Sequence, residues 1–205
     1  MRSLVISLLL LAVLFLGFDI SPKAFRKEIR QYQKEQHKKF KNPKESPFRD
    51  KVDEYKGLKY FPANIKYRQK ARFERLKKQR PFEIKTSNPD KDKTFVPFAK
   101  LHFSLEGKEL SLIAYKNLEL PPIGKYKKHL FLPFMDLTNG ESTYGGGRYI
   151  DLEIPDGDIL ILDFNKAYNP YCAYRSDGWS CPIPPEENFL DMEIKAGVKK
   201  YKLKY

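Results

Sequence analysis

Alternating apolar residues on both sides of the dipeptide Glu106-Gly107 constrain the fold of this chain more than any other feature. A two-residue turn at this dipeptide pairs the flanking segments as a β-hairpin. Every second residue then points to one apolar face, which consists of Leu101, Phe103, Leu105, Leu110 and Leu112. His102 and Ser111 fall on the other face, so we expect His102 to be a half-exposed strand residue and not a ligand or a catalytic base.

Two more turn signals follow along the chain. Asn139-Gly140 and Asp156-Gly157 separate short apolar segments, so residues 98–170 are predicted to form successive antiparallel strands. With 205 residues the chain has room for one packed core, and residues 46–205 are expected to form a single β-rich domain. The predicted fold is mostly β (α+β), a small antiparallel barrel or sandwich with an N-terminal amphipathic helix.

The N-terminus has the composition of an export signal. Met1, Arg2 and Ser3 precede an almost wholly apolar run over residues 4–18. This run is shorter than the roughly 20 residues that span a bilayer, but no small-x-small cleavage pattern follows it. Residues 1–20 are therefore predicted to be a signal peptide or an N-terminal anchor, and the protein to be exported, in the periplasm or the cell envelope.

Residues 21–45 are predicted to form a basic amphipathic helix. Its apolar stripe follows steps of three and four residues and consists of Phe25, Ile29, Tyr32, Gln36 and Phe40. Asn42-Pro43 ends the helix. The stripe either packs on the domain behind it, which we favour, or lies on a membrane surface.

The net charge of +13 belongs to the N-terminal third of the chain. Residues 23–80 hold 21 Lys and Arg against 7 Asp and Glu, whereas residues 81–205 hold 17 against 18. A solvated helix face and contact with anionic lipid both fit this distribution. Nucleic acid is not an expected partner, because the aromatic residues form no recognisable stacking motif.

A glycine-rich segment at residues 138–149 is the most unusual stretch. Gly145, Gly146 and Gly147 precede Arg148, so backbone N–H groups and a guanidinium could hold a phosphate or a carboxylate. The alternative is a β-bulge or barrel corner in which Arg148 pairs with a nearby carboxylate. The segment is neither a Walker loop nor a dinucleotide fingerprint, because the residues that follow the glycines do not fit.

The strands around Asp156-Gly157 allow two hairpin registers. A two-residue turn places Arg148 opposite Asn165 and on the same face as Asp163. A type I turn with a bulge, which we favour, places Arg148 opposite Phe164 and separates it from Asp163. The pair of Arg148 with Asp163 is thus conditional on the first register.

Only two cysteines are present, Cys172 and Cys181. If residues 175–178 form a hairpin loop, Tyr174 faces Trp179 and the two cysteines face each other. In an oxidising compartment they are then expected to form a disulfide. Their spacing matches no Cys-x-x-Cys redox motif and supplies only half of a zinc site, so we predict no metal site.

The chain resembles the family catalogued as domain of unknown function 1684, found in bacteria and archaea. The resemblance is carried by the motifs at residues 131–140, 143–149, 163–174 and 181–188, within a match from about Phe25 to Gly197. It implies no activity and leaves any cofactor unknown, but it suggests a shared ligand-binding site. The candidate site residues are Asp136, Thr138, Thr143, Tyr144, Gly145, Gly146, Gly147, Arg148, Asp163, Asn165, Asn169 and Glu187.

Three classes of function follow from these residues. We expect a domain that binds a small anionic or polyhydroxylated ligand at the glycine-rich segment. The first alternative is a hydrolase-like enzyme that uses Asp136 or Asp163 with Arg148, in which a perturbed carboxylate lies in a pocket. As for a histidine base, only His37, His102 and His129 are available. The second alternative is a structural or interaction protein of the cell envelope.

Overall fold

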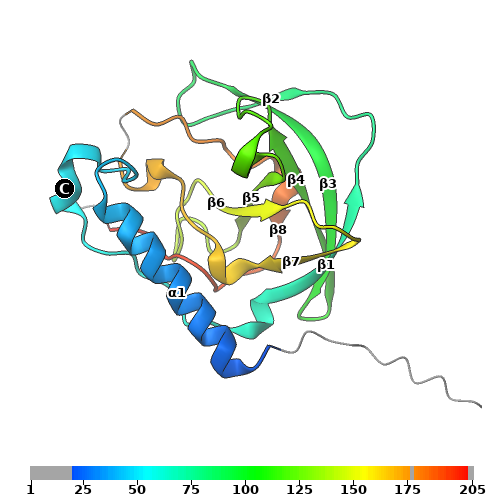
Figure 1. Ribbon diagram of the computed structural model, residues 1–205, viewed down its shortest axis with the longest axis horizontal. Helices are drawn as coiled ribbons and strands as arrows, with labels where there is room; N and C mark the ends of the chain where they lie inside the picture. Colours follow the sequence, from blue (N-terminus) through cyan, green and yellow to red (C-terminus); the bar gives the residue numbers. More distant parts are fainter. Residues whose placement is uncertain (1–19, 176–177, 203–205) are drawn as a thin grey trace, which may run out of the picture.

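The chain folds into a curled antiparallel sheet with one long helix beside it (Figure 1). The computed structural model describes residues 20–175 and 178–202, so the predicted signal or anchor lies outside the described residues except for its last position. Six strands pair in the order β6-β5-β4-β3-β1-β7 and form a half-barrel, while β2 pairs with β3 and β8 runs parallel to β5. The prediction of a mostly β fold with an N-terminal helix is confirmed.

The regular elements have the following bounds: α1 (Pro22–Lys41), β1 (Arg68–Arg75), β2 (Phe82–Ile84), β3 (Lys93–Leu105), β4 (Lys108–Asn117), β5 (His129–Asp136), β6 (Arg148–Glu153), β7 (Ile159–Asp163) and β8 (Phe189–Leu190). Short 3-10 turns lie at Arg49–Glu54, Ile65–Tyr67, Gly124–Tyr126, Phe164–Lys166, Tyr171–Ala173 and Glu186–Asn188. No helix in the described part of the chain has both the length and the apolar character of a membrane span.

The hairpin of β3 and β4 has the predicted register. Phe103 pairs with Leu110, Leu101 with Leu112, and His102 with Ser111. Glu106 and Gly107 both have positive φ, 53° and 77°, as a two-residue type I′ turn requires. The His102 side chain is 30% exposed and its Nε2 lies 2.8 Å from a Glu74 carboxylate oxygen, so it is the half-exposed strand residue that was expected.

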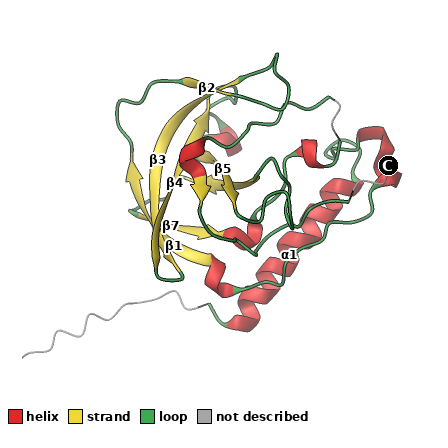
Figure 2. Ribbon diagram, turned by 180° about the vertical axis from the view of Figure 1, so that it is seen from behind, coloured by secondary structure: helices red, strands yellow, loops and turns green. Residues whose placement is uncertain are grey.

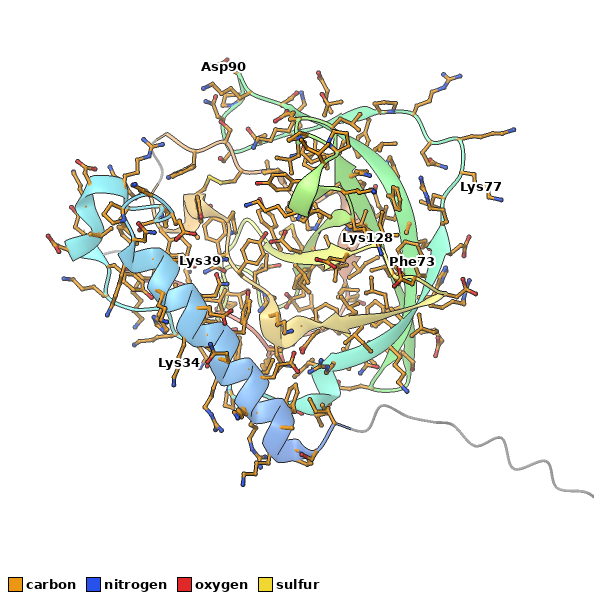
Figure 3. All side chains as sticks on the ribbon, in the orientation of Figure 1. Lys34, Lys39, Phe73, Lys77, Asp90 and Lys128 are labelled. Carbon is orange, nitrogen blue, oxygen red and sulfur yellow. A yellow bond between two sulfur atoms is a disulfide. The ribbon has the colours of Figure 1, made fainter. Side chains whose placement is uncertain are left out.

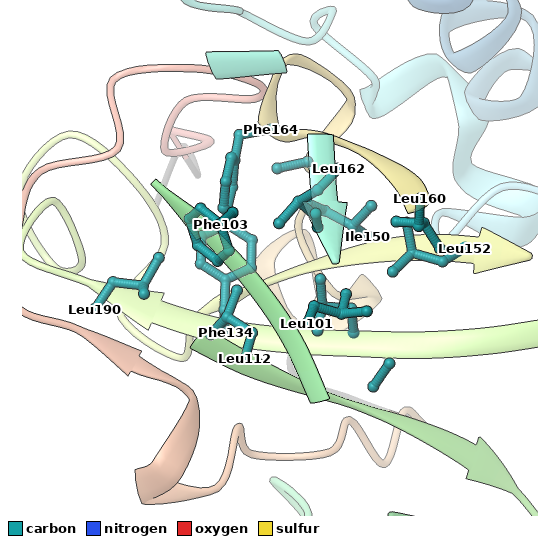
Figure 4. Close-up of a cluster of buried hydrophobic side chains, with 14 of the residues drawn as sticks. Leu101, Phe103, Leu112, Phe134, Ile150, Leu152, Leu160, Leu162, Phe164 and Leu190 are labelled. Atoms are coloured by element: carbon teal, nitrogen blue, oxygen red, sulfur yellow. The ribbon is translucent and has the colours of Figure 1, made fainter. Parts of the chain in front are cut away.

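The main core fills the concave side of the sheet. Buried side chains from β3, β4, β5, β6 and β7 meet there, and Figure 4 shows Leu101, Phe103, Leu112, Phe134, Leu162 and Phe164 among them. A smaller aromatic cluster lies on the other side of β5 and β6 and consists of Ile84, Phe95, Tyr115, Phe131 and Tyr149. The alternation of residues along β5, with Leu130 and Leu132 in one cluster and Phe131 in the other, gives both faces of this strand buried contacts.

Helix α1 packs its apolar stripe on the domain, as we favoured. Phe25, Ile29 and Phe40 are buried, and the Tyr32 hydroxyl donates to the Lys166 carbonyl at 2.7 Å. Ser21 caps the N-terminus of the helix and Asn42 ends it in extended backbone. The two views in Figures 1 and 2 place α1 and the β3–β4 hairpin on opposite sides of the molecule.

The predicted hairpin of β6 with β7 does not form, so both proposed registers were wrong. β6 pairs with β5 and places Arg148 opposite Phe134, whereas β7 pairs with β1. The Asp156-Gly157 turn connects two strands that end the sheet on either side. A groove of about 310 Å³ lies between them, lined by residues of both strands. The curled sheet therefore stays open along this edge.

The disulfide of Cys172 with Cys181 is present, with a Cα–Cα distance of 6.3 Å. It does not join a hairpin, because Tyr171–Ala173 is a 3-10 turn and the segment after Cys181 pairs with the chain near Thr86. The expected contact of Tyr174 with Trp179 was also wrong. Trp179 packs edge-on against Tyr171, while Tyr174 packs against Phe40.

Candidate functional site

Arg148 is the centre of a buried polar network. Its side chain is 0% exposed, and its Nη2 donates to Asp136 Oδ2 at 2.7 Å. The guanidinium also donates to the main-chain carbonyls of Ile194 and Ala196. Burial lowers the pKa of Arg148, and the neighbouring Asp136 carboxylate acts in the opposite direction. These contacts tie the start of β6 to the end of β5 and to the C-terminal segment.

Asp136 is equally enclosed. Its Oδ1 accepts hydrogen bonds from the Thr138 backbone N–H, the Thr138 hydroxyl and the Ile194 backbone N–H. Thr138 in turn lies 2.8 Å, hydroxyl to hydroxyl, from Thr143. The side chains of Asp136, Thr138, Thr143 and Arg148 are all buried, and none of them lines a cavity described below. The network therefore closes the loop of residues 137–147 from within.

The three glycines have different surroundings. Gly147 has a φ of +85°, and a Cβ placed on it would lie 2.6 Å from Pro184 Cγ and 2.8 Å from the Phe134 carbonyl oxygen. Gly145 has only ordinary contacts at 3.7 Å or more, and at Gly146 a Cβ would meet the flexible Tyr144 ring. Backbone geometry thus requires glycine at Gly147 in particular.

Asp163 and Asn165 form a separate cluster. Asp163 Oδ1 accepts from the Asn165 backbone N–H and side-chain amide, and Oδ2 lies 3.6 Å from Arg68 Nη1. Burial raises the pKa of Asp163, opposed by the hydrogen bonds from Asn165 and by Arg68. Asn165 also holds the backbone of Asn64. Arg148 is paired with Asp136, so the conditional pair of Arg148 with Asp163 is not formed.

Two more predicted site residues, Tyr144 and Glu187, lie apart from the network and from each other. Tyr144 borders an open groove of about 1060 Å³ that carries five lysines, Lys56, Lys59, Lys199, Lys200 and Lys202. Glu187 accepts a hydrogen bond of 2.8 Å from the Tyr115 hydroxyl. The twelve candidate residues are thus spread over several places, and their role in ligand binding stays a prediction.

A partly enclosed space lies between α1 and the β5–β6 end of the sheet. This aromatic cavity has a volume of about 490 Å³. Its walls come from α1, from β3, β5 and β6, and from the segments around residues 58–60, 166–174 and 180–182. Nine Phe and Tyr rings line it: Tyr32, Phe40, Tyr60, Phe95, Phe131, Tyr149, Tyr168, Tyr171 and Tyr174.

Most tyrosine hydroxyls of this cavity are already held by the protein. Tyr32 donates to the Lys166 carbonyl, Tyr149 to the Pro182 carbonyl and Tyr171 to the Glu45 carbonyl. Burial raises the pKa of Tyr149 and of Tyr60, so these groups stay neutral in the physiological range. The rings therefore form fixed, uncharged walls.

The cavity lining also contains charged and polar groups. It includes three lysines, Lys39, Lys93 and Lys166, and one carboxylate, Asp151. Lys166 is paired with Glu28 at 2.7 Å. Asn169 is 1% exposed, and its Oδ1 accepts no hydrogen bond from any described residue. A buried acceptor without a donor is uncommon, and Asn169 Oδ1 shares this state with Asp92 Oδ1 and Asp163 Oδ2.

His129, Asp151 and Tyr168 form a hydrogen-bonded cluster in the same wall. Asp151 Oδ1 lies 3.0 Å from His129 Nε2 and accepts from the Tyr168 hydroxyl at 2.9 Å. A histidine held by a carboxylate is a common arrangement for proton transfer. Within residues 20–175 and 178–202, no group of three or more His, Cys, Asp or Glu side chains is arranged to hold a metal ion.

Of the candidate binding residues predicted from the sequence, only Asn169 lines this cavity, and His129 was named there only as an available histidine base. The lining residues come from segments up to 166 positions apart, from Tyr32 to Val198. The spacing of Tyr168, Tyr171 and Tyr174 by three residues was an available signal, since such spacing brings side chains together on one side of a turn.

The chain belongs to the family described as protein of unknown function (DUF1684), whose model matches residues 53–199. This match begins after α1, later than the extent expected from the sequence motifs. The fold is similar to the solution NMR structure of an uncharacterised protein from Haloarcula marismortui, with a TM-score of 0.66 and 31% sequence identity over 86% of this chain and 95% of that one. No curated protein matches the chain.

Proposed function

We propose that the protein binds a small organic anion with a flat or apolar body in the aromatic cavity. The observation that carries this proposal is the composition of the lining: nine Phe and Tyr rings line a space of about 490 Å³ together with three lysines and one aspartate. This volume falls in the range of small-molecule sites. The proposal keeps the anionic ligand expected from the sequence and moves its site away from Arg148.

The lining separates two kinds of contact. Aromatic faces bind flat rings or the apolar faces of sugars, with roughly 0.5–1.5 kcal/mol beyond area burial for a ring pair. Among the described residues, Lys39 and Lys93 form no ion pair with a carboxylate, so their charge is available to a ligand carboxylate or phosphate. Asn169 Oδ1 adds an acceptor that selects a ligand N–H or O–H.

The test is thermal unfolding of the protein against flavin mononucleotide, aromatic carboxylates, nucleotides and sugar phosphates, since a ligand that binds the folded state raises the Tm. Gln36→Trp fills the cavity from α1, and Gln33→Trp is its matched control because Gln33 does not line the cavity. Lys39→Glu reverses a lining charge, and Lys38→Glu changes the same charge one residue away. We expect the Tm shift to disappear in the first member of each pair and to remain in the second.

Two results would contradict the proposal. If a ligand shift survives Gln36→Trp but is lost in Lys200→Glu, the ligand binds at the lysine groove beside Tyr144. If no compound of the panel shifts the Tm of the wild type, a structural or interaction protein becomes the better description.

A second candidate function, an enzyme using acid–base catalysis, is favoured by the cluster of His129 with Asp151 and Tyr168. This cluster replaces the expected use of Arg148 with Asp136, because both side chains of that pair are fully buried and line none of the cavities described above. Chromogenic ester and phosphate substrates test it. Turnover by the wild type that His129→Gln abolishes, with an unchanged Tm, supports an enzyme, and turnover that persists in His129→Gln argues against it.

We also propose that the protein is exported. The apolar run at residues 4–18 and the disulfide of Cys172 with Cys181 support this, since disulfides persist outside the cytosol. Cell fractionation, with thiol labelling of each fraction, tests it: we expect the protein in the envelope or the medium with both cysteines blocked. A cytosolic protein with free thiols would contradict export.

A further inference from the structure

The outer face of α1 carries a continuous row of positive charge. Lys23, Lys27, Lys34 and Lys41 lie within a narrow arc of the helix, and Arg26, Arg30 and Lys38 flank them. At about 100° per residue, all seven fall within about 120° of the helix circumference and extend over about 27 Å. We call this the cationic stripe. Phe25, Ile29 and Phe40 lie roughly opposite it and are buried.

Every side chain of the cationic stripe is exposed. In Figure 3, Lys34 lies on the side of α1 that points away from the sheet. The two acidic residues of α1, Glu28 and Glu35, are outside the stripe, and Glu28 is occupied by Arg68 and Lys166. Among the described residues, none of the seven stripe cations is in an ion pair with a carboxylate.

The stripe is unfavourable for the helix itself. Like charges three and four residues apart repel, and cations near the N-terminus oppose the helix dipole. The first turn of α1 has no acidic residue. Of the stripe residues only Lys38 and Lys41, in the last turn, suit the helix dipole. A flat polyanionic surface, in contrast, compensates the repulsion along the whole row.

We propose that the cationic stripe binds the surface of a bilayer that contains anionic lipid. Charge complementarity carries the choice of partner, because each Lys or Arg close to an anionic surface strengthens binding roughly fivefold. The position in the chain agrees with it, since α1 begins four residues after the apolar run at residues 4–18. A row along one straight helix matches a plane, and the aromatic cavity on the opposite side of α1 stays clear of it.

The test is a competition of the full chain between two vesicle populations, one of phosphatidylcholine and one that also contains phosphatidylglycerol and is loaded with sucrose so that it sediments. Any contact of residues 4–18 is common to both populations, so the distribution reports the stripe alone. The stripe variant is K27Q/K34Q/K38Q, and the control K77Q/R80Q/K91Q removes three exposed charges elsewhere. Far-UV circular dichroism and the Tm check that both stay folded.

We expect the wild type and the control to prefer the anionic vesicles and the stripe variant to lose roughly a hundredfold of this preference. The preference should also weaken with added salt, because exposed charges are screened. Equal distribution of the wild type would overturn the proposal, as would an equal loss in the control. Tight binding of duplex DNA by the stripe without a preference for anionic vesicles would assign it to another polyanion.

Discussion

Replacing Arg148 by methionine separates a structural role of this residue from a role in ligand binding. The side chain is fully buried, donates to Asp136 and to two main-chain carbonyls, and lines none of the cavities described above. Removal of one partner of a buried ion pair costs about 3–5 kcal/mol, because the other charge stays buried without compensation. Asp136 keeps three donors from Thr138 and Ile194, so we expect the lower part of this range.

The assay is equilibrium unfolding in guanidinium chloride, followed by tyrosine and tryptophan fluorescence. A matched control is Arg72→Met, whose guanidinium lies 3.3 Å from Glu74 but is 57% exposed. Exposed pairs of this kind contribute about 0–1 kcal/mol. The double variant R148M/D136N should lose less than the sum of the single variants, because its two sites share one interaction.

A loss below about 1 kcal/mol in Arg148→Met would refute the structural reading. If that variant also lost a ligand shift, the expectation of an anion site at the glycine-rich segment would regain its force. Asp136→Asn keeps an oxygen acceptor for Thr138, so this variant should remain folded. It tests the same ion pair by removing the carboxylate instead of the guanidinium.

Three further predictions concern other parts of the fold. Gly147→Ala should lower the free energy of unfolding by about 2 kcal/mol or more, because Gly147 has a positive φ and lies close to the Phe134 carbonyl. Gly145→Ala should change this free energy by no more than about 0.5 kcal/mol. Equal losses of the two variants in urea unfolding would argue against this reasoning. Reduction of the disulfide, which closes a loop with a sequence separation of 9, should cost about 2.7 kcal/mol, and an unchanged Tm in reductant would contradict it. Burial raises the pKa of Asp163, so the folded chain binds this proton more tightly than the unfolded chain, and the contribution of Asp163 to stability improves as pH falls. Asp163→Asn should therefore be more stable than the wild type at about pH 7 and lose this advantage towards about pH 4, whereas a difference that does not change with pH would exclude the burial cost.

Local signals in the sequence predicted the local structure. The β3–β4 hairpin was found with its register, because the turn at Glu106-Gly107 and the alternation of leucines specify the same pairing. Helix α1 was found because its apolar period and its end at Asn42 agree. The pairing of Cys172 with Cys181 was also correct, although the hairpin used to predict it does not exist.

Long-range pairing was not accessible in the same way. The chain bends at Asp156-Gly157, but a turn signal does not say which strands pair across it, and β6 and β7 each find a partner elsewhere in the sheet. For the same reason the sequence left two alternatives for Arg148, an anion site and a corner in which it pairs with a nearby carboxylate, and the structure has the pair with Asp136. Its partner Asp136 is close in the chain, but the carbonyls of Ile194 and Ala196 that complete its burial are more than forty residues away.

Helix α1 has one face in the wall of the aromatic cavity and the opposite face in the cationic stripe. If both proposed contacts exist, ligand and bilayer act on the same rigid element, and their affinities are linked reciprocally. Any factor by which vesicles change the affinity for the ligand is the factor by which the ligand changes the affinity for vesicles. Loading and release of the ligand would then depend on whether the protein rests on a membrane.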